Sequence, residues 1–182
     1  MAKKWTTVEV LRHARHDWMN DLQLIKANLS LNRIERANEI IDEIIRSARN
    51  ESNVMNLNTP ELFEYLITFN WSKHPIDLKF QVDGKVRDLH TYEETLLNGC
   101  RLILSLLNSH ASMKTENKIR LTIATDPLLL SFHFTGGLEN REMMEDALED
   151  FKKTHKTFSI IESYIRQDEL FLSLTFVDEK HI

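Results

Sequence analysis

The pattern of apolar residues in the first fifty positions predicts two long helices. Apolar side chains recur at alternating three- and four-residue steps along the first helix and form one seam: Leu11, Ala14, Trp18, Leu22, Ile25 and Leu29. Thr6 and Glu9 have the spacing of a capping box, so this helix should begin there and continue to about Asn28. A second helical pattern runs from Ile34 to Ala48, and no glycine or proline occurs before Pro60.

The short connection between these two patterns predicts an antiparallel helical hairpin. Ser30 and Asn32 supply the turn and capping chemistry between the helices. Two helices alone cannot cover two apolar seams, so we expect two copies of the chain to associate into a homodimeric four-helix bundle. Because Trp18 lies on the seam, we expect it to belong to the core.

The pattern changes after residue 50. Residues 50–58 break the helical period and are predicted to be a linker, and Thr59-Pro60-Glu61 predicts the start of a further helix. Alternating or apolar runs then predict strands at 76–82, 119–123, 128–134, 159–165 and 170–177. Helices are predicted between them, one capped by Thr91 and Glu94 and one, mainly acidic, at 139–153.

The resulting order, α-β-α-β-β-α-β-β, favours an α/β sandwich over a doubly wound sheet. The predicted fold class is therefore α+β, with a helical hairpin domain at residues 1–55 and an α/β domain at residues 56–182. The pair Gly136-Gly137 follows a predicted strand and could be a phosphate loop, although a plain turn is the simpler interpretation.

Composition and charge narrow the class of protein. The chain has 182 residues, of which 42% are hydrophobic and 28% charged, as in ordinary globular proteins. Its net charge of −5 argues against general nucleic-acid binding. Residues 1–33 hold six basic and three acidic residues, so the first helix is locally basic. The single cysteine excludes an internal disulfide, and the lack of a signal peptide or a membrane-length apolar run predicts a cytoplasmic protein.

His16 is the candidate reactive group, because it lies on the polar face beside the seam. An ordinary solvated imidazole is mostly neutral at pH 7 and can attack phosphorus without a separate base. Neighbouring arginines can pair with phosphate oxygens, and both features suit phosphoryl transfer. The other candidate residues surround it on the same helix: Arg12, His13, Arg15, Asp17, Asn20 and Gln23.

Two other interpretations of this region remain open. A histidine between arginines on a helix is often only part of a solvated face. Alternatively, His13, His16 and Asp17 could hold a metal ion, although nothing in the sequence supplies an obvious third and fourth ligand. The other six of the eight histidines have no recognisable partner pattern.

The stretch Arg15-His-Asp-Trp-Met-Asn-Asp-Leu-Gln23 resembles the phosphoacceptor helix of two-component histidine kinases of the H-D-x-x-N kind. Residues 13–31 resemble more closely the related sporulation phosphotransferases of endospore-forming bacteria, and the similarity extends to residues 56–60 and 66–71. The resemblance implies a dimeric four-helix bundle followed by a domain like a kinase ATP-binding domain. It also implies that His16 is the phosphorylated residue and that Arg15, Asp17 and Asn20 match the surrounding motif.

The same resemblance implies an activity and its partners. The histidine would accept a phosphoryl group from the aspartyl phosphate of a single-domain response regulator. It would then pass the group to an aspartate of a DNA-binding regulator that controls sporulation. Arg12, His13 and Gln23 would contact these receiver domains, no cofactor would be bound by this chain, and Mg²⁺ would be held by the receiver. An inert scaffold that only docks receivers or kinases is the alternative.

The sequence departs from the kinases where they bind ATP. Two asparagines four residues apart are expected on the main helix of a kinase nucleotide domain, where this chain has Ser105 and Ser109. An Asp-x-Gly-x-Gly segment is also expected where this chain has Phe134-Thr-Gly-Gly-Leu138. These replacements predict that phosphoryl transfer is independent of ATP.

Overall fold

The computed structural model describes residues 5–166 and 168–176. The chain divides into two compact units, Met1–Asn50 and Glu51–Ile182. Val177, the last residue of the predicted strand 170–177, and Gln167, between the last two predicted strands, lie outside the described residues. None of the described helices is long and apolar enough to cross a membrane.

The first unit is the predicted hairpin, formed by α1 (Thr7–Ser30) and the greater part of α2 (Ile34–Met55). The capping box is confirmed: Thr6 Oγ1 accepts a hydrogen bond from the Glu9 N–H at 3.3 Å, and Glu9 Oε2 accepts from the Thr6 N–H at 2.9 Å. Asn32 turns the chain between the helices with a left-handed φ of 55°.

The hairpin buries very little of its own apolar surface. No residue of α1 is buried, and in the hairpin part of α2 only Ala37 and Ile40 are buried. Trp18 is 74% exposed in the single chain, so its place in a core depends on the expected dimer and stays a prediction. Two straight helices touch along one line, and residues on the other flank of the seam stay uncovered. The exposed seam supports the expected dimer, which stays a prediction.

The end of α2 differs from the sequence prediction. Residues 50–55 continue the helix to Met55, so the prediction of a linker beginning at residue 50 is wrong. Val54 and Leu57 are completely buried in the core of the second unit, and the Leu57 carbonyl accepts a hydrogen bond from the Leu89 N–H at 2.8 Å. Two apolar anchors in an otherwise polar stretch therefore fix a segment whose sequence looks like a linker.

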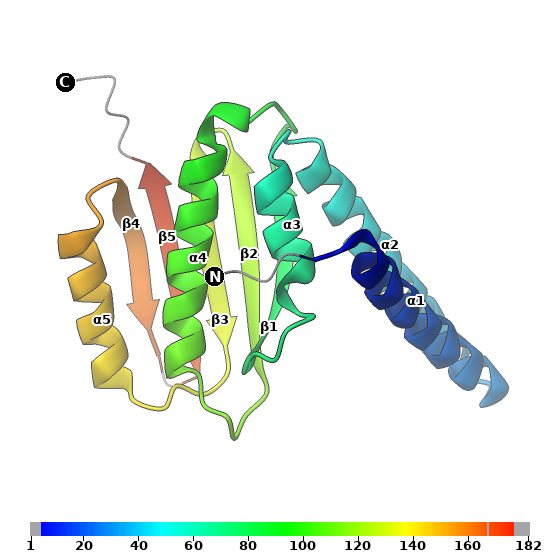
Figure 1. Ribbon diagram of the computed structural model, residues 1–182. Helices are drawn as coiled ribbons and strands as arrows, with labels where there is room; N and C mark the ends of the chain where they lie inside the picture. Colours follow the sequence, from blue (N-terminus) through cyan, green and yellow to red (C-terminus); the bar gives the residue numbers. More distant parts are fainter. Residues whose placement is uncertain (1–4, 167, 177–182) are drawn as a thin grey trace. The chain divides into compact units, whose positions relative to one another are not determined.

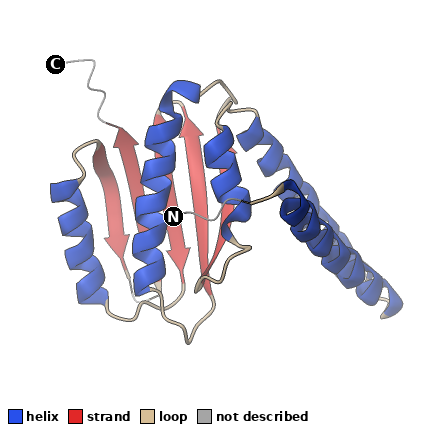
Figure 2. Cartoon of the chain, viewed as in Figure 1, coloured by secondary structure: helices blue, strands red, loops and turns tan. Residues whose placement is uncertain are grey.

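The second unit is a two-layer α/β sandwich, as predicted. Figures 1 and 2 show its three α-helices on one face of a single five-stranded sheet. The strand order is β1-β2-β3-β5-β4, in which β1 and β2 are parallel and the other pairs antiparallel. In chain order the elements are α3 (Pro60–Phe69), β1 (Ile76–Asp83), the 3₁₀ turn η1 (His90–Tyr92), α4 (Glu93–His110), β2 (Asn117–Thr125), β3 (Leu128–Thr135), α5 (Arg141–Thr154), β4 (Phe158–Ile165) and β5 (Glu169–Phe176).

Strand alternation builds the core of this unit. On β2 and β3 every second residue faces the helices, and Ile119, Leu121 and Ile123 are opposite Phe134, Phe132 and Leu130. Leu96, Cys100, Ile103, Leu104 and Leu107 of α4 cover them and are buried too. This packing confirms the predicted α+β class, with a helical hairpin first and a unit of mixed helices and strands afterwards.

The predicted cap of α4 is not observed. The chain enters α4 through η1, and no side chain caps its first turn, so Thr91 and Glu94 do not form the expected box. Glu93 instead accepts a hydrogen bond from the Glu61 N–H at 2.7 Å, at the start of α3. The Glu61 N–H has no partner within α3, and a side chain of α4 accepts its hydrogen bond. No local sequence pattern could indicate this contact.

Candidate functional site on helix α1

His16 lies in the middle of α1 with its side chain 70% exposed. The helix presents it because residues 7–30 form one uninterrupted run started by the capping box at Thr6. The imidazole is therefore fixed at its base by regular backbone while its ring faces solvent. A macromolecule can reach such a group, whereas it cannot reach a residue at the bottom of a cavity.

Two polar side chains contact the same nitrogen of this ring. Asn20 Nδ2 lies 3.2 Å from His16 Nδ1, and Asp17 Oδ1 lies 3.4 Å from the same atom. A carboxylate only accepts hydrogen bonds, so the contact with Asp17 requires a proton on Nδ1. A half-turn of the Asn20 amide would present its oxygen to Nδ1 as well. As placed, the Asn20 amide donates to a bare Nδ1, so the tautomer with the proton on Nδ1 suits Asp17 directly and suits Asn20 only with its amide turned.

The consequence of this arrangement is an open Nε2. Among the described residues, no side chain or backbone group forms a hydrogen bond with His16 Nε2. With the proton on Nδ1, the lone pair of the neutral ring is on Nε2 and points away from its neighbours. That is the geometry of a nucleophilic imidazole with one nitrogen oriented by a carboxylate.

The remaining predicted residues surround His16 without touching it. Arg12, Arg15 and Gln23 are exposed on α1, and none of them forms a hydrogen bond or ion pair with His16 in the described part of the chain. His13 is partly buried, and its ring meets that of Trp5 edge to face with centroids 5.1 Å apart. The structure thus brings Asp17 and Asn20 to His16, while His13 contacts Trp5.

The local electrostatics of the helix are mixed. Partial burial raises the pKa of the Asp21 carboxyl above its usual value, and the negative charge of Asp17 raises it further. Arg12 and Arg15 add positive charge on the same stretch of helix. Within the residues that the structure describes, no group of three His, Cys, Asp or Glu side chains is arranged to hold a metal ion.

The Gly136-Gly137 pair is a tight turn in this structure. The Gly137 N–H donates to Asn117 Oδ1 at 3.0 Å and to Thr115 Oγ1 at 3.1 Å, so it points into the protein and not toward a ligand. Gly136 has a φ of 145°, and a Cβ there would lie 2.3 Å from Asn117 Oδ1. Glycine is needed here for close packing, which favours the turn over a phosphate loop.

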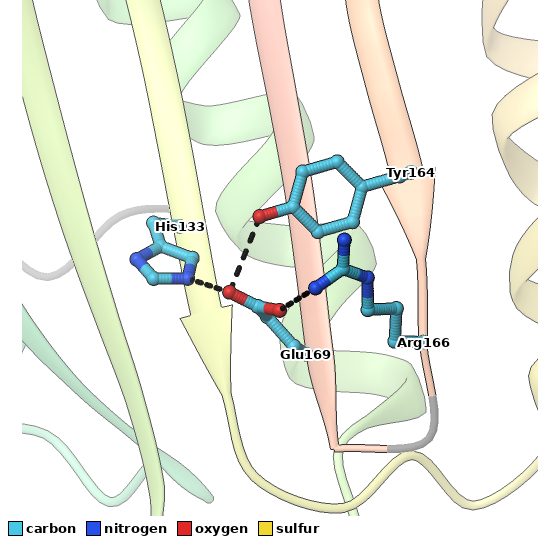
Figure 3. Close-up of polar contacts among 4 residues, drawn as sticks. All are labelled: His133, Tyr164, Arg166 and Glu169. Atoms are coloured by element: carbon cyan, nitrogen blue, oxygen red, sulfur yellow. Dashed lines mark hydrogen bonds and ion pairs between the residues drawn. The ribbon is translucent and has the colours of Figure 1, made fainter.

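Sequence reasoning missed a polar cluster in the second unit. Glu169 of β5 accepts hydrogen bonds from His133 Nε2 at 2.6 Å and from the Tyr164 hydroxyl at 3.2 Å, and Arg166 Nη1 lies 3.4 Å from its other oxygen (Figure 3). His133 is one of the histidines without a recognisable partner in sequence. His133 reaches Glu169 only because β3 and β5 pair in this register. The sole sign of this contact in the sequence was the alternation of residues along the strands.

Comparison with known proteins decides the family. Residues 58–177 match the family described as "Sporulation initiation phospho-transferase B, C-terminal", and residues 1–57 match "Sensor_kinase_SpoOB-type, alpha-helical domain". The chain belongs to the sporulation initiation phosphotransferase B family. It is 37% identical over 143 residues to Sporulation initiation phosphotransferase B of Bacillus subtilis (strain 168), a match that covers 76% of this chain and 74% of the relative.

Solved structures of lower similarity include two of a blue-light activated histidine kinase from Erythrobacter litoralis EL346. Its histidine kinase domain matches 63% of this chain with a TM-score of 0.41 and 9% identity. A second structure of that kinase matches 97% of this chain with a TM-score of 0.36 and 11% identity. The matched regions cover 57% and 61% of those kinase chains, less than two thirds of their length.

Proposed function

We propose that this member of the sporulation initiation phosphotransferase B family carries phosphoryl groups between response regulators through His16. The observation that carries the proposal is the exposed imidazole whose Nδ1 is contacted by Asp17 and Asn20 while Nε2 stays open. The named activity of the relative in Bacillus subtilis supports it independently. The donor is a single-domain response regulator, and the acceptor is a DNA-binding regulator of sporulation.

The reaction proceeds in two displacements. The Nε2 lone pair of His16 attacks the phosphorus of the donor aspartyl phosphate. An Nε2–P bond forms, the P–O bond breaks, and the electron pair returns to the donor carboxylate. In the second step a carboxylate of the acceptor attacks phosphorus, and the P–N bond breaks with its electron pair returning to Nε2. Mg²⁺ held by the receiver would neutralise phosphoryl oxygens, while this chain orients the imidazole.

The neighbours of His16 have distinct parts in this proposal. Asp17 holds the proton on Nδ1 and stabilises the positive charge that the ring acquires when Nε2 is phosphorylated. Asn20 restricts ring rotation, and Arg15 pairs with phosphoryl oxygens. Arg12, His13 and Gln23 contact the receiver surface. The exposed apolar seams of α1 and α2 support a homodimeric four-helix bundle as the active form.

ATP takes no part in the proposed reaction. Ser105 and Ser109 replace the asparagines expected in a kinase, and the Ser109 hydroxyl donates to the Leu106 carbonyl at 2.8 Å. The Gly137 N–H is occupied by Asn117, as described above. We expect calorimetric titration to detect no binding of Mg-ATP, and micromolar affinity would return the kinase interpretation.

Phosphoryl uptake from a radiolabelled phospho-receiver tests the proposal. The wild-type chain and His13→Gln should become labelled with an acid-labile, alkali-stable phosphate, as expected for a phosphohistidine. His16→Gln keeps the helix and a hydrogen-bonding side chain but removes the nucleophile, so it should take up no label. Normal labelling of His16→Gln would overturn the proposal. Absence of label on the wild type, with receiver binding intact, would favour the inert scaffold.

A further inference from the structure

The sheet of the second unit has one face that none of the unit's helices covers. All three α-helices of the unit lie on the opposite face (Figure 2). Because side chains alternate along a strand, the residues between the buried apolar ones point to this open face. The charged residues among them on β1 and β2 are three cations, Lys79, Lys118 and Arg120, and two carboxylates, Asp77 and Asp83.

Strand register places two of these cations side by side. Lys79 of β1 is directly opposite Arg120 of β2, and Arg120 is opposite His133 of β3. Neighbouring strands lie about 4.8 Å apart, so the two charged side chains start within that distance of each other. Like charges in directly opposite positions destabilise a sheet. The repulsion between Lys79 and Arg120 therefore does not contribute to the stability of the fold.

No group of this chain compensates the pair. In the described residues, neither the Lys79 nor the Arg120 side chain forms an ion pair or a hydrogen bond, and both residues are exposed. Lys118 has a weak contact with Glu116, at 3.6 Å, in which both side chains are highly exposed. On β1 and β2 the face thus holds three cations and two carboxylates, Asp77 opposite Lys118 and Asp83 at the end of β1.

The carboxylate on the neighbouring part of the face is already occupied. Glu169 receives His133, Tyr164 and Arg166 on its two oxygens (Figure 3). Its hydrogen bond with His133, supported by that with Tyr164, keeps the pKa of Glu169 below its usual value, so the carboxylate stays charged and bound to these donors. The open face is therefore divided into a half on β3, β4 and β5, where Glu169 binds three donors and Glu162 adds a second carboxylate, and a basic half on β1 and β2, where three cations outnumber two carboxylates; the first is called the neutralised half.

The aromatic residues of the neutralised half argue against a nucleic acid as the ligand. The Tyr164 ring stacks on Phe171 with centroids 5.6 Å apart, and the Arg166 guanidinium lies 4.8 Å from the Tyr164 centroid. Ring faces occupied in this way are not free to stack on bases. The net charge of −5 also repels a long polyanion. A carboxylate-bearing polypeptide needs no free ring faces, and a short one carries fewer charges for the net charge to repel.

We propose that the basic half of the open sheet face is a docking surface for an acidic polypeptide segment of a partner protein, whose carboxylates pair with Lys79 and Arg120. A bound segment replaces the repulsion between these two side chains by attraction. Charge complementarity of this kind mainly accelerates association and selects partners. The surface lies in the second unit, and the proposal does not depend on phosphoryl transfer at His16.

Fluorescence anisotropy with a labelled polyglutamate peptide tests this surface in the full chain. Lys79→Gln combined with Arg120→Gln removes the opposed pair, and both side chains are exposed, so the fold should be retained. The matched control is Arg87→Gln combined with Lys156→Gln, which removes the same charge from loops outside the sheet. Circular dichroism and thermal unfolding of each variant verify that the fold is intact.

The wild type should bind polyglutamate, the sheet variant should bind about tenfold more weakly, and the loop variant should bind as the wild type does. The proposal would be overturned if the wild type did not bind the peptide, or if the sheet variant bound it as tightly as the wild type does. Arg12→Gln combined with Arg15→Gln serves as a further arm: loss of binding only in that variant would assign the peptide to α1. Tighter binding of an oligothymidylate of equal charge or of phosphatidylglycerol vesicles would also overturn it.

Discussion

The two units of this chain differ in how they combine packing with chemistry. In the hairpin, α1 has no buried residue, and the candidate nucleophile His16 is 70% exposed. In the second unit, a continuous core fills the space between helices and sheet, with Leu104, Phe132 and Phe134 completely inaccessible. In the proposed reaction His16 would meet a whole receiver domain, which requires an open helix face. The rigid core is therefore placed in another unit or must come from a second copy.

The largest expected difference between the units is in stability. Phe132→Ala removes a fully buried ring from the second unit and should lower its free energy of unfolding by about 3–5 kcal/mol. Trp18→Ala removes a ring that is 74% exposed and should leave the unfolding of the second unit unchanged. Denaturant titration followed by circular dichroism measures both. Equal destabilisation by the two substitutions would contradict this difference in packing between the two units.

Dimerisation of the hairpin is the next largest expected effect. Ile41→Asp places a carboxylate on the apolar side of α2, and at a buried interface an unpaired charge should weaken association by about 100-fold or more. Asn38→Asp adds the same charge at an exposed polar position of the same helix and is the control. Analytical ultracentrifugation of the full chain decides the outcome. A wild-type chain that sediments as a monomer at micromolar concentration would remove the basis for the four-helix bundle.

The border between the units can be tested at the end of α2. Val54→Ala should destabilise the second unit by about 2 kcal/mol, because its side chain is completely buried in that unit's core. Met55→Ala changes a neighbour that is 60% exposed and should have little effect. Chemical denaturation of both variants makes the comparison. If Val54→Ala is neutral, residues 51–57 act as the linker that their polar composition suggests.

A smaller effect is expected at the arginines beside His16. Arg12→Gln and Arg15→Gln should each slow association with an acidic receiver surface a few-fold and reduce its dependence on salt. Arg15→Gln should also lower the transfer rate if its guanidinium pairs with phosphoryl oxygens. Stopped-flow mixing at several ionic strengths separates these contributions. Arg33→Gln, in the connection between α1 and α2, should leave both rates unchanged.

The smallest expected effect is the pH dependence of the Glu169 cluster. The hydrogen bond from His133, followed by that from Tyr164, holds the pKa of Glu169 below its ordinary value of 4.5. The cluster therefore contributes its full stability above about pH 4.5, and this contribution is lost as the pH falls through the lowered pKa. Thermal unfolding from neutral pH to about pH 3 should show the difference between wild type and Glu169→Gln shrinking as the pH falls. Glu64→Gln, at an exposed helix position, should show no such trend.

The sequence predicted those features that depend on local pattern. The capping box at Thr6 lies within four residues, and the alternating apolar residues of the strands report burial directly. The segment around residue 54 was misread because most of its residues are polar, and only contacts with distant elements make Val54 a core residue. Likewise, Thr91 and Glu94 have capping chemistry, but a 3₁₀ turn occupies the position where a cap would form.

In the candidate site, too, the sequence predicted local contacts and missed those that depend on distant segments. Residues on one helix lie at fixed angles, so helical spacing placed Asn20 beside His16, whereas Asp17 was expected there from the resemblance. The sequence could not indicate that His13 packs against Trp5, because that contact depends on the path of the chain before the helix. The opposition of Lys79 and Arg120, and the meeting of His133 with Glu169, depend on strand register between segments 36 or more residues apart. Local periodicity determines which face a side chain occupies, but only the tertiary structure determines which side chains share that face.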